Sequence, residues 1–282
     1  MLALGVFFPY NICTARHYTE RYTDAIHTKR DRGRFVMIRF LIVCAEVIGF
    51  LIVFLPVMLV EMAIGKFNPR ARDISSLRIV QGAFRLILWT TGVRITEIGH
   101  ENVPTDQAVL YIGNHRSFFD ILLTYTRCPD LTGYVAKKSM EKVPLLSIWM
   151  KLLHCLFMDR ENLKEGLKTI LAGVDLIKSG ISVCIFPEGT RSHRASDLDM
   201  LPFHEGSFKL ATKTDCPIIP ISINNSSDIW EAHFPRIKRT HVIVEYGKPI
   251  IPSELSKEDK KHIGTYVQNV ILETLKKNEK LL

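Results

Sequence analysis

The sequence predicts an α/β protein with a mixed, largely parallel sheet flanked by helices and an N-terminal membrane-associated helical segment. After Gly99, short apolar runs alternate with helical patterns, which is typical of strands joined by crossover helices. The runs are residues 108–112, 134–136, 155–158, 181–186, 217–223 and 241–246. Before Gly99, an almost unbroken apolar stretch sets the first third of the chain apart. We therefore divide the chain into residues 1–36, 37–95 and 96–282, the last being the predicted catalytic domain.

Residues 1–36 combine a short apolar start with a polar stretch. Met1 to Tyr10 is too short to span a membrane and lacks the basic region of a secretion signal. From His17 to Arg34 the chain is polar and has no clear periodicity. We predict a flexible tail for this segment.

Residues 37–95 are predicted to meet a membrane. The apolar run from Phe40 to Val60 is broken only by Glu46 and Pro56, and at about 1.5 Å per residue a helix of this length matches the roughly 30 Å hydrocarbon layer. Basic residues flank both ends, so the positive-inside rule selects no orientation. We favour a re-entrant hairpin slightly over a full span.

A second helix is expected at residues 75–92. One face of it is apolar and the other carries Arg78, Gln81 and Arg85, which is the pattern of an interfacial helix on anionic lipid. The alternative, an ordinary buried helix of a soluble core, fits these residues nearly as well. The apolar positions are Leu77, Val80, Phe84, Ile87 and Leu88.

The composition favours an anionic partner. The chain of 282 residues is 47% hydrophobic and 23% charged, which indicates a globular protein, and its net charge is +8. A positive net charge favours binding to a membrane surface, a phosphorylated substrate or nucleic acid. Because the sequence has no Lys/Arg run interleaved with aromatics and no DNA-reading motif, we expect no nucleic-acid partner.

The cysteines and histidines do not predict a metal site. The six cysteines have no paired spacing, so reduced thiols in a cytosol-facing protein are the simpler interpretation. His193, His204 and His241 have no partners at ligand spacing. We expect neither a metal nor a bound cofactor.

His115 and Asp120 are the predicted catalytic residues. On a regular helix, five residues turn the side chain by about 140°, so this pair meets only if the segment bends. Gly113 and Asn114 supply a turn after an apolar strand, and Ser117 is a plausible N-cap for the following helix. Asp120 would then hold one imidazole nitrogen while the other accepts a proton from a substrate hydroxyl.

A second turn, residues 186–192, supplies anion-binding groups. Glu188 and Arg191 flank Gly189 and Thr190 directly after an apolar run. Gly189 permits a sharp turn with exposed backbone donors, which would stabilise the oxyanion of a tetrahedral intermediate. Arg191 has a planar guanidinium suited to phosphate.

Four sequence blocks together resemble a known family. They are Gly113–Asp120, Leu156–Arg160, Phe186–Ser192 and Pro217–Pro220, in the order and approximate spacing of the glycerolipid acyltransferases. From about residue 37 to residue 255 the chain resembles the bacterial 1-acyl-sn-glycerol-3-phosphate acyltransferases. Met37 to Phe40 resembles the start of many relatives, so a translation start at Met37 is an open hypothesis.

The resemblance implies roles for further residues. The second and third blocks of the family are associated with the glycerol phosphate, so Arg160, Glu188, Gly189, Thr190 and Arg191 are expected to bind substrate. Lys137 matches a lysine of the family and is a further candidate. The alternatives are a surface ion pair of Arg160 with Asp159 or Glu161, and an ordinary surface lysine at position 137.

The activity implied is an acyl transfer to a lipid. An acyl-CoA or acyl-carrier protein would donate the acyl group to the sn-2 hydroxyl of lysophosphatidic acid, giving phosphatidic acid. The enzyme would lie at the cell membrane, in contact with the lipid bilayer, with its catalytic domain facing the cytoplasm. Alternatives are acylation of another lysophospholipid or of glycerol 3-phosphate, or a non-catalytic lipid-binding membrane protein of the same fold. A hydrolase is less favoured because no G-x-S-x-G elbow is present.

Overall fold

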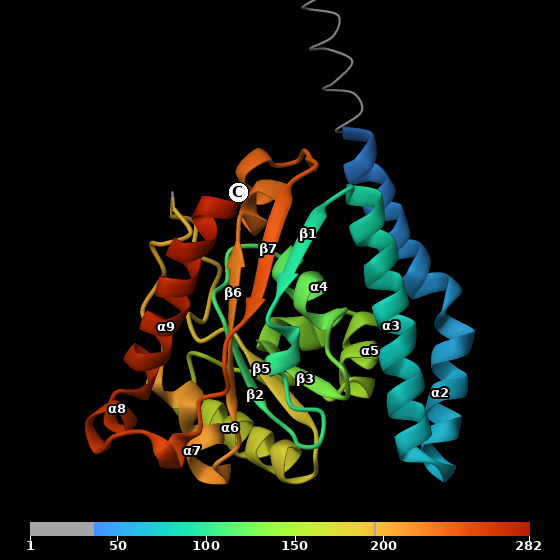
Figure 1. The fold of residues 1–282 in the computed structure, drawn as a ribbon. Coiled ribbons are helices and arrows are strands. Elements are labelled where there is room, and N and C mark those ends of the chain that lie inside the picture. The colour runs from blue at the N-terminus through green and yellow to red at the C-terminus, as the bar shows by residue number, and fades with distance from the viewer. Residues whose placement is uncertain (1–36, 195) are drawn as a thin grey trace, which may run out of the picture.

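A seven-stranded mixed sheet forms the centre of the protein (Figure 1). The computed structural model describes residues 37–194 and 196–282, so the predicted flexible tail at residues 1–36 lies outside the described residues. The strands lie in the order β1-β7-β6-β2-β5-β3-β4, and all neighbours are parallel except β6 and β7. Their bounds are β1 Arg94–Ile98, β2 Leu110–Gly113, β3 Thr132–Lys137, β4 Leu156–Met158, β5 Ser182–Ile185, β6 Ile218–Asn224 and β7 His241–Tyr246. The predicted fold class is confirmed.

Each apolar run of the sequence overlaps a strand, but β1 was not predicted. Its residues Arg94–Ile98 alternate polar and apolar side chains, and the strand lies at one edge of the sheet with two of its five residues exposed. An edge strand needs less apolar surface than a central one. The apolar runs used for prediction therefore pointed to the buried strands and missed this one.

Helices cover both faces of the sheet. One face packs against α3 (Pro69–Thr91), α4 (Phe119–Tyr125) and α5 (Leu146–Leu152), and the other against α6 (Leu163–Lys178), α7 (Lys209–Thr214) and α9 (Ile263–Asn278) (Figure 1). The short helix α8 (Lys257–Lys261) precedes α9. Because side chains alternate along a strand, Tyr111 belongs to the first core and Leu110 and Ile112 to the second.

Helix α6 begins where the sequence predicts it. The Asn162 side chain accepts hydrogen bonds from the backbone amides of Lys164 and Glu165, at 3.1 and 3.2 Å. Three of the predicted apolar positions are buried: Ile170, Val174 and Ile177. Three others, Leu163, Leu167 and Leu171, are 91%, 47% and 40% exposed. Steps of four residues rotate by about 40° around a helix, so these leucines drift away from the buried face.

The apolar run from Phe40 to Val60 forms two helices. Met37–Val53 and α2 (Leu55–Phe67) meet at a bend of 48°, two residues before Pro56. Among the described residues, no single helix has both the length and the apolar composition to cross a membrane, whereas this bent pair meets both criteria together. Both helices are hydrogen-bonded to α3, because Thr90 donates to Glu46 and Ser75 donates to Glu61.

The apolar face of α3 packs against protein. Leu77, Val80, Ile87 and Leu88 are buried in the first core, and the helix contacts α4 and α5. The prediction that this face rests on lipid is therefore wrong, and the alternative of a buried helix is correct for it. The prediction failed because an amphipathic pattern indicates that one face of a helix is covered, but it does not distinguish lipid from protein as the cover.

The carboxyl ends of β2, β5, β3 and β4 share one edge of the sheet, because these strands are parallel neighbours. The loops that follow β2, β5 and β4 carry the first three sequence blocks. At roughly 4.8 Å between strands, the end of β4 lies about 14 Å from the end of β2. The fold thus brings these blocks to one edge and makes the loops after β2 and β5 immediate neighbours.

Candidate active site

His115 and Asp120 meet as predicted. The Nδ1 atom of His115 lies 2.8 Å from Oδ2 of Asp120. The chain bends between β2, which ends at Gly113, and α4, which begins at Phe119, so His115 lies in the loop and Asp120 in the first helical turn. A carboxylate accepts hydrogen bonds and does not donate them, so Nδ1 carries a proton, and in the neutral imidazole the lone pair is then on Nε2.

Asp120 also organises the loop around His115. The same Oδ2 atom accepts hydrogen bonds from the backbone amides of Arg116, at 2.7 Å, and Ser117, at 2.8 Å, and the side chain is completely buried. Ser117 was predicted to be the N-cap, but the helix begins one residue later, with Phe118 at that position. The Ser117 hydroxyl still accepts from the amide of Phe119 at 3.0 Å.

The imidazole of His115 also packs against an aromatic ring. It stacks on the ring of Phe186, with 4.4 Å between ring centroids and 16° between the planes. Its side chain remains 16% exposed, and in the described part of the chain Nε2 has no hydrogen-bond partner. The ring is therefore fixed in orientation while its unprotonated nitrogen remains accessible, which is the geometry a general base requires.

Both carboxylate oxygens of Glu188 accept hydrogen bonds from backbone amides. Its Oε1 accepts from the amide of His115 at 2.7 Å, and its Oε2 accepts from the amide of Leu201 at 2.8 Å. The residue is only 4% exposed. Burial raises the pKa of Glu188, and the two backbone hydrogen bonds partly oppose that rise. These contacts favour a positioning role over the predicted contact with substrate, which stays a prediction.

The turn at residues 186–192 lies directly against the loop of the base. The amide of Ser192 donates to the carbonyl oxygen of His115 at 2.7 Å. Gly189 has a φ of +75°, a conformation that glycine adopts without strain, but its own amide donates to Phe186 and is not free for an oxyanion. Among the described residues, the amides of Thr190 and Arg191 have no acceptor. These two groups are the better candidates for the predicted oxyanion donors.

Arg191 lies beside α4. Its guanidinium carbon is 3.7 Å from the centroid of the Phe118 ring, and Nη1 donates to Oε1 of Glu231 at 3.1 Å. A guanidinium stacked on an aromatic ring keeps its edge available for hydrogen bonds. The side chain is 26% exposed, so a ligand has access to it.

Arg160 follows β4 and Lys137 is the last residue of β3, so both lie on the same edge of the sheet. Both are exposed, and neither forms an ion pair with any described residue. Asp159 instead accepts hydrogen bonds from the backbone amides of Glu161 and Asn162, so the alternative ion pair of Arg160 is not formed. Arg160 is farther from His115 than Arg191 is, because β4 is three strands from β2 and β5 is adjacent to it.

The sequence did not single out Glu231 or Arg116. Glu231 accepts from Ser117, Phe118 and Arg191, which ties the two loops of the site together. The buried guanidinium of Arg116 pairs with Asp197 at 2.8 Å. Glu231 is distant in sequence from Ser117, and Asp197 is distant from Arg116, so no local sequence pattern indicates either contact. Within the described residues, no cluster of three or more His, Cys, Asp or Glu side chains could hold a metal ion.

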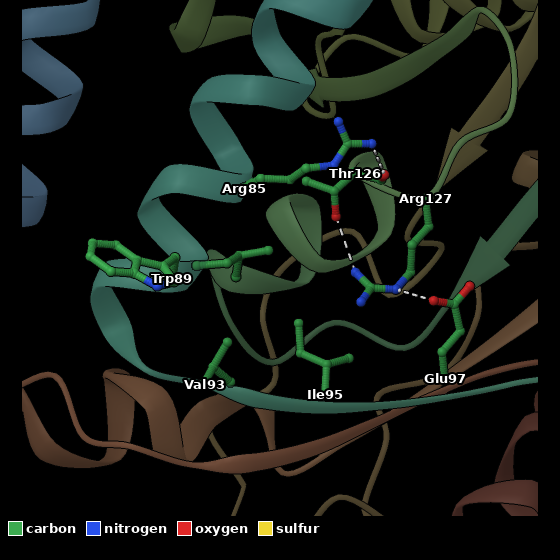
Figure 2. Close-up of a pocket in the computed structure, with 8 residues that line it drawn as sticks. Arg85, Trp89, Val93, Ile95, Glu97, Thr126 and Arg127 are labelled. Carbon is green, nitrogen blue, oxygen red and sulfur yellow. Dashed lines mark hydrogen bonds and ion pairs between the residues drawn. The ribbon is translucent and has the colours of Figure 1, made fainter.

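A cavity of about 410 Å³ lies between α3, β1 and the end of α4 (Figure 2). Figure 2 shows Arg127 donating to Thr126 and to Glu97 beside it. None of the predicted site residues lines this cavity, so its size alone does not make it the reaction site. The residues that line it are Arg85, Leu88, Trp89, Val93, Ile95, Glu97, Thr126 and Arg127.

Comparison with known proteins agrees with the geometry. Residues 94–224 match the family model described as Acyltransferase, a range that includes every predicted site residue. Residues 94–224 therefore carry an acyltransferase domain. The chain is similar to a 1-acyl-sn-glycerol-3-phosphate acyltransferase of Saccharomyces cerevisiae, with 33% identity over 66% of this chain and 61% of the yeast protein. A protein of the same name from Borreliella burgdorferi is 27% identical over 71% of this chain and 80% of its own.

The chain also resembles a solved structure. The crystal structure of a 1-acyl-sn-glycerophosphate acyltransferase from Thermotoga maritima superposes with a TM-score of 0.75, covering 88% of this chain and 98% of that one. The identity is 20%, so this likeness shows the fold alone. The structural likeness covers more of the chain than the family model does, since that model matches only residues 94–224.

Proposed function

We propose that this acyltransferase transfers a fatty acyl group from a thioester donor to the sn-2 hydroxyl of 1-acyl-sn-glycerol 3-phosphate, giving phosphatidic acid. The observation that carries the proposal is the buried Asp120 holding an accessible His115 beside Arg191. A base beside a cation suits an acceptor that bears both a hydroxyl and a phosphate. The names of the related proteins support the same acceptor.

The geometry supports a direct attack on the thioester. Nε2 of His115 takes the proton of the acceptor hydroxyl while Asp120 stabilises the imidazolium through Nδ1. The hydroxyl oxygen attacks the thioester carbonyl, and the oxyanion that forms accepts hydrogen bonds from the amides of Thr190 and Arg191. The carbon–sulfur bond then breaks, and the thiolate leaves as a thiol after taking the proton from His115. The donor is an acyl-CoA or an acyl-carrier protein.

Arg191 supplies the main contact for the acceptor phosphate, with Lys137 and Arg160 on the same edge of the sheet. Arg191 stacks on Phe118, three residues after His115, whereas Arg160 follows a strand about 14 Å away, at roughly 4.8 Å per strand spacing. Since the hydroxyl and the phosphate belong to one small glycerol unit, the nearer cation is better placed. The Glu188 carboxylate positions the backbone of His115 in this scheme.

The N-terminal helices bring the site to its lipid substrate. Large apolar side chains of both are exposed, among them Leu41, Ile48, Ile52, Leu59, Val60 and Phe67. Exposed apolar patches of this kind mark interaction surfaces, and burial in lipid is the simplest way to cover them. Phe40 also stacks on Trp230, which precedes Glu231, so the first helix contacts the neighbourhood of the site. We place the enzyme at the membrane, with the catalytic domain facing the cytoplasm.

A panel of acceptors tests the proposal. Purified protein is incubated with acyl-CoA or acyl-carrier protein and with lysophosphatidic acid, lysophosphatidylcholine, monoacylglycerol or glycerol 3-phosphate. We expect thiol release and phosphatidic acid formation with lysophosphatidic acid, and much less product from acceptors without a phosphomonoester. Equal use of monoacylglycerol would contradict a phosphate site, and thiol release without any acceptor would indicate a hydrolase.

A further inference from the structure

Glu231 joins the two loops of the site through one carboxylate. It lies in the short turn η5 (Glu231–His233), outside the four sequence blocks. Its Oε2 accepts from the Ser117 hydroxyl at 2.7 Å, and its Oε1 accepts from the amide of Phe118 at 2.8 Å and from Nη1 of Arg191 at 3.1 Å. The side chain is only 11% exposed. Buried carboxylates with three donors are strongly fixed in place.

The contact with Arg191 leaves the phosphate-binding edge of the guanidinium open. Glu231 engages only Nη1, by a single hydrogen bond, and among the described residues neither Nε nor Nη2 of Arg191 has a partner. A carboxylate that blocked the site would pair with the guanidinium through two parallel hydrogen bonds. The stacking on Phe118 fixes the plane of the guanidinium, and Glu231 fixes its rotation within that plane.

We infer that Glu231 is a positioning residue that orients Arg191 toward the phosphate of the acceptor and so helps the enzyme select phosphorylated acceptors. The inference rests on the proposed acylation of lysophosphatidic acid. A free arginine side chain loses rotamer freedom when it binds a ligand, and an arginine held in place beforehand loses less. Glu231 also anchors Phe118, the ring on which Arg191 stacks, so both supports of the guanidinium depend on the same carboxylate.

The Glu231→Gln variant tests this role with little change in shape. The amide oxygen at the position of Oε1 still accepts from the Phe118 amide and from Nη1 of Arg191, and the amide nitrogen can donate to the Ser117 hydroxyl, but the negative charge that attracts the guanidinium is removed. We expect the KM for lysophosphatidic acid to rise by about 5- to 10-fold, since charge-assisted hydrogen bonds are about twice as strong as neutral ones. The kcat should stay within about twofold and the donor KM should not change, because Asp120 and His115 keep their contacts. Glu279→Gln, at an exposed residue that pairs with no other described side chain, is the matched control.

A double variant separates positioning from a general structural effect. If Glu231 acts through Arg191, adding Glu231→Gln to Arg191→Ala should not raise the acceptor KM further. Calorimetric binding of lysophosphatidic acid without donor gives the same comparison independently of turnover. Thermal unfolding of each variant checks that the fold is retained.

Three outcomes would overturn the inference. An unchanged acceptor KM in Glu231→Gln would show that Arg191 needs no orientation, and a lower KM would show that Glu231 competes with the phosphate. An equal loss in the Arg191→Ala background would assign Glu231 a structural role alone. Failure of the proposed function looks different, because the wild type itself would then form no phosphatidic acid; that result would overturn both.

Discussion

The side chain of Glu188 accepts a hydrogen bond from the backbone amide of His115, with 2.7 Å between oxygen and nitrogen. Its second oxygen accepts from the amide of Leu201. This buried carboxylate therefore fixes the base loop, which is the loop between β2 and α4 that carries His115, against the turn at residues 186–192. The glutamate that sequence resemblance assigns to substrate is thus engaged by the protein itself. We propose that it acts by positioning His115.

Glu188→Gln should destabilise the protein in a pH-dependent way. Burial raises the native pKa of Glu188, so its contribution to stability is complete below the unfolded pKa, about 4.3, and is lost as the pH rises through the raised native value. The glutamine side chain has only one acceptor oxygen, so it can accept from the backbone amide of His115 or of Leu201 but not from both. The backbone amide that is left unsatisfied costs about 1–3 kcal/mol of stability. Urea unfolding of wild type and variant from about pH 4 to about pH 8 measures the difference. We expect the wild-type advantage to be largest at acidic pH; a constant or growing advantage would contradict the assignment.

Arg191→Ala should impair acceptor use more than Arg160→Ala. A charged hydrogen bond to phosphate is worth about 1.5–3 kcal/mol, or roughly ten- to a hundred-fold in kcat/KM. Arg191 is adjacent to the base loop, whereas Arg160 follows β4, three strands away from β2. Ratios of kcat/KM for phosphorylated and dephosphorylated acceptors measure the effect, with Arg191→Lys as the charge-conserving control. If both alanine variants keep the wild-type ratio, the phosphate binds elsewhere and Lys137 is the next candidate.

Gly189→Ala should reduce both stability and activity. The φ of +75° costs an alanine about 1–2 kcal/mol, and its Cβ would lie 3.3 Å from the His204 ring. Because the turn carries the amides of Thr190 and Arg191, any relief of strain moves the proposed oxyanion donors. Gly206→Ala is the control, since no atom of the described residues lies within 4 Å of the position of its added Cβ. Wild-type kcat in a stable Gly189→Ala variant would argue against an oxyanion site in this turn.

Membrane attachment should resist salt and depend on the exposed apolar residues of the N-terminal helices. Ile52 and Leu59 are 61% and 58% exposed, and Asn at either position would reduce apolar burial in lipid. We expect wild type to stay with sedimented vesicles in about 1 M salt, because salt screens charge attraction and not apolar burial. The Ile52→Asn/Leu59→Asn protein should shift to the supernatant. Leu163→Asn, at a residue 91% exposed on α6, is the control and should not shift.

The central strands and the catalytic pair follow from local sequence patterns. Continuous apolar runs identify buried strands such as β2 and β6, and a five-residue separation after a glycine turn is enough to predict that His115 and Asp120 meet. Local patterns also predict α6 and its Asn162 cap. Each of these features depends on residues close together in the chain.

Features that depend on distant contacts were not predictable. Glu231 meets Ser117 across 114 positions of sequence, and nothing near either residue indicates the pair. The apolar face of α3 has the same pattern whether lipid or protein covers it, and here α4 and α5 do.

The turnover of His115→Ala with lysophosphatidic acid and a thioester donor tests the central claim most directly. If Nε2 of His115 takes the hydroxyl proton, removing the imidazole should lower kcat by roughly 10² to 10⁴, the usual size of general base catalysis. The fold should persist, because Asp120 keeps its hydrogen bonds from Arg116 and Ser117. Phosphatidic acid formation at a near-wild-type rate by a folded His115→Ala protein would contradict the mechanism.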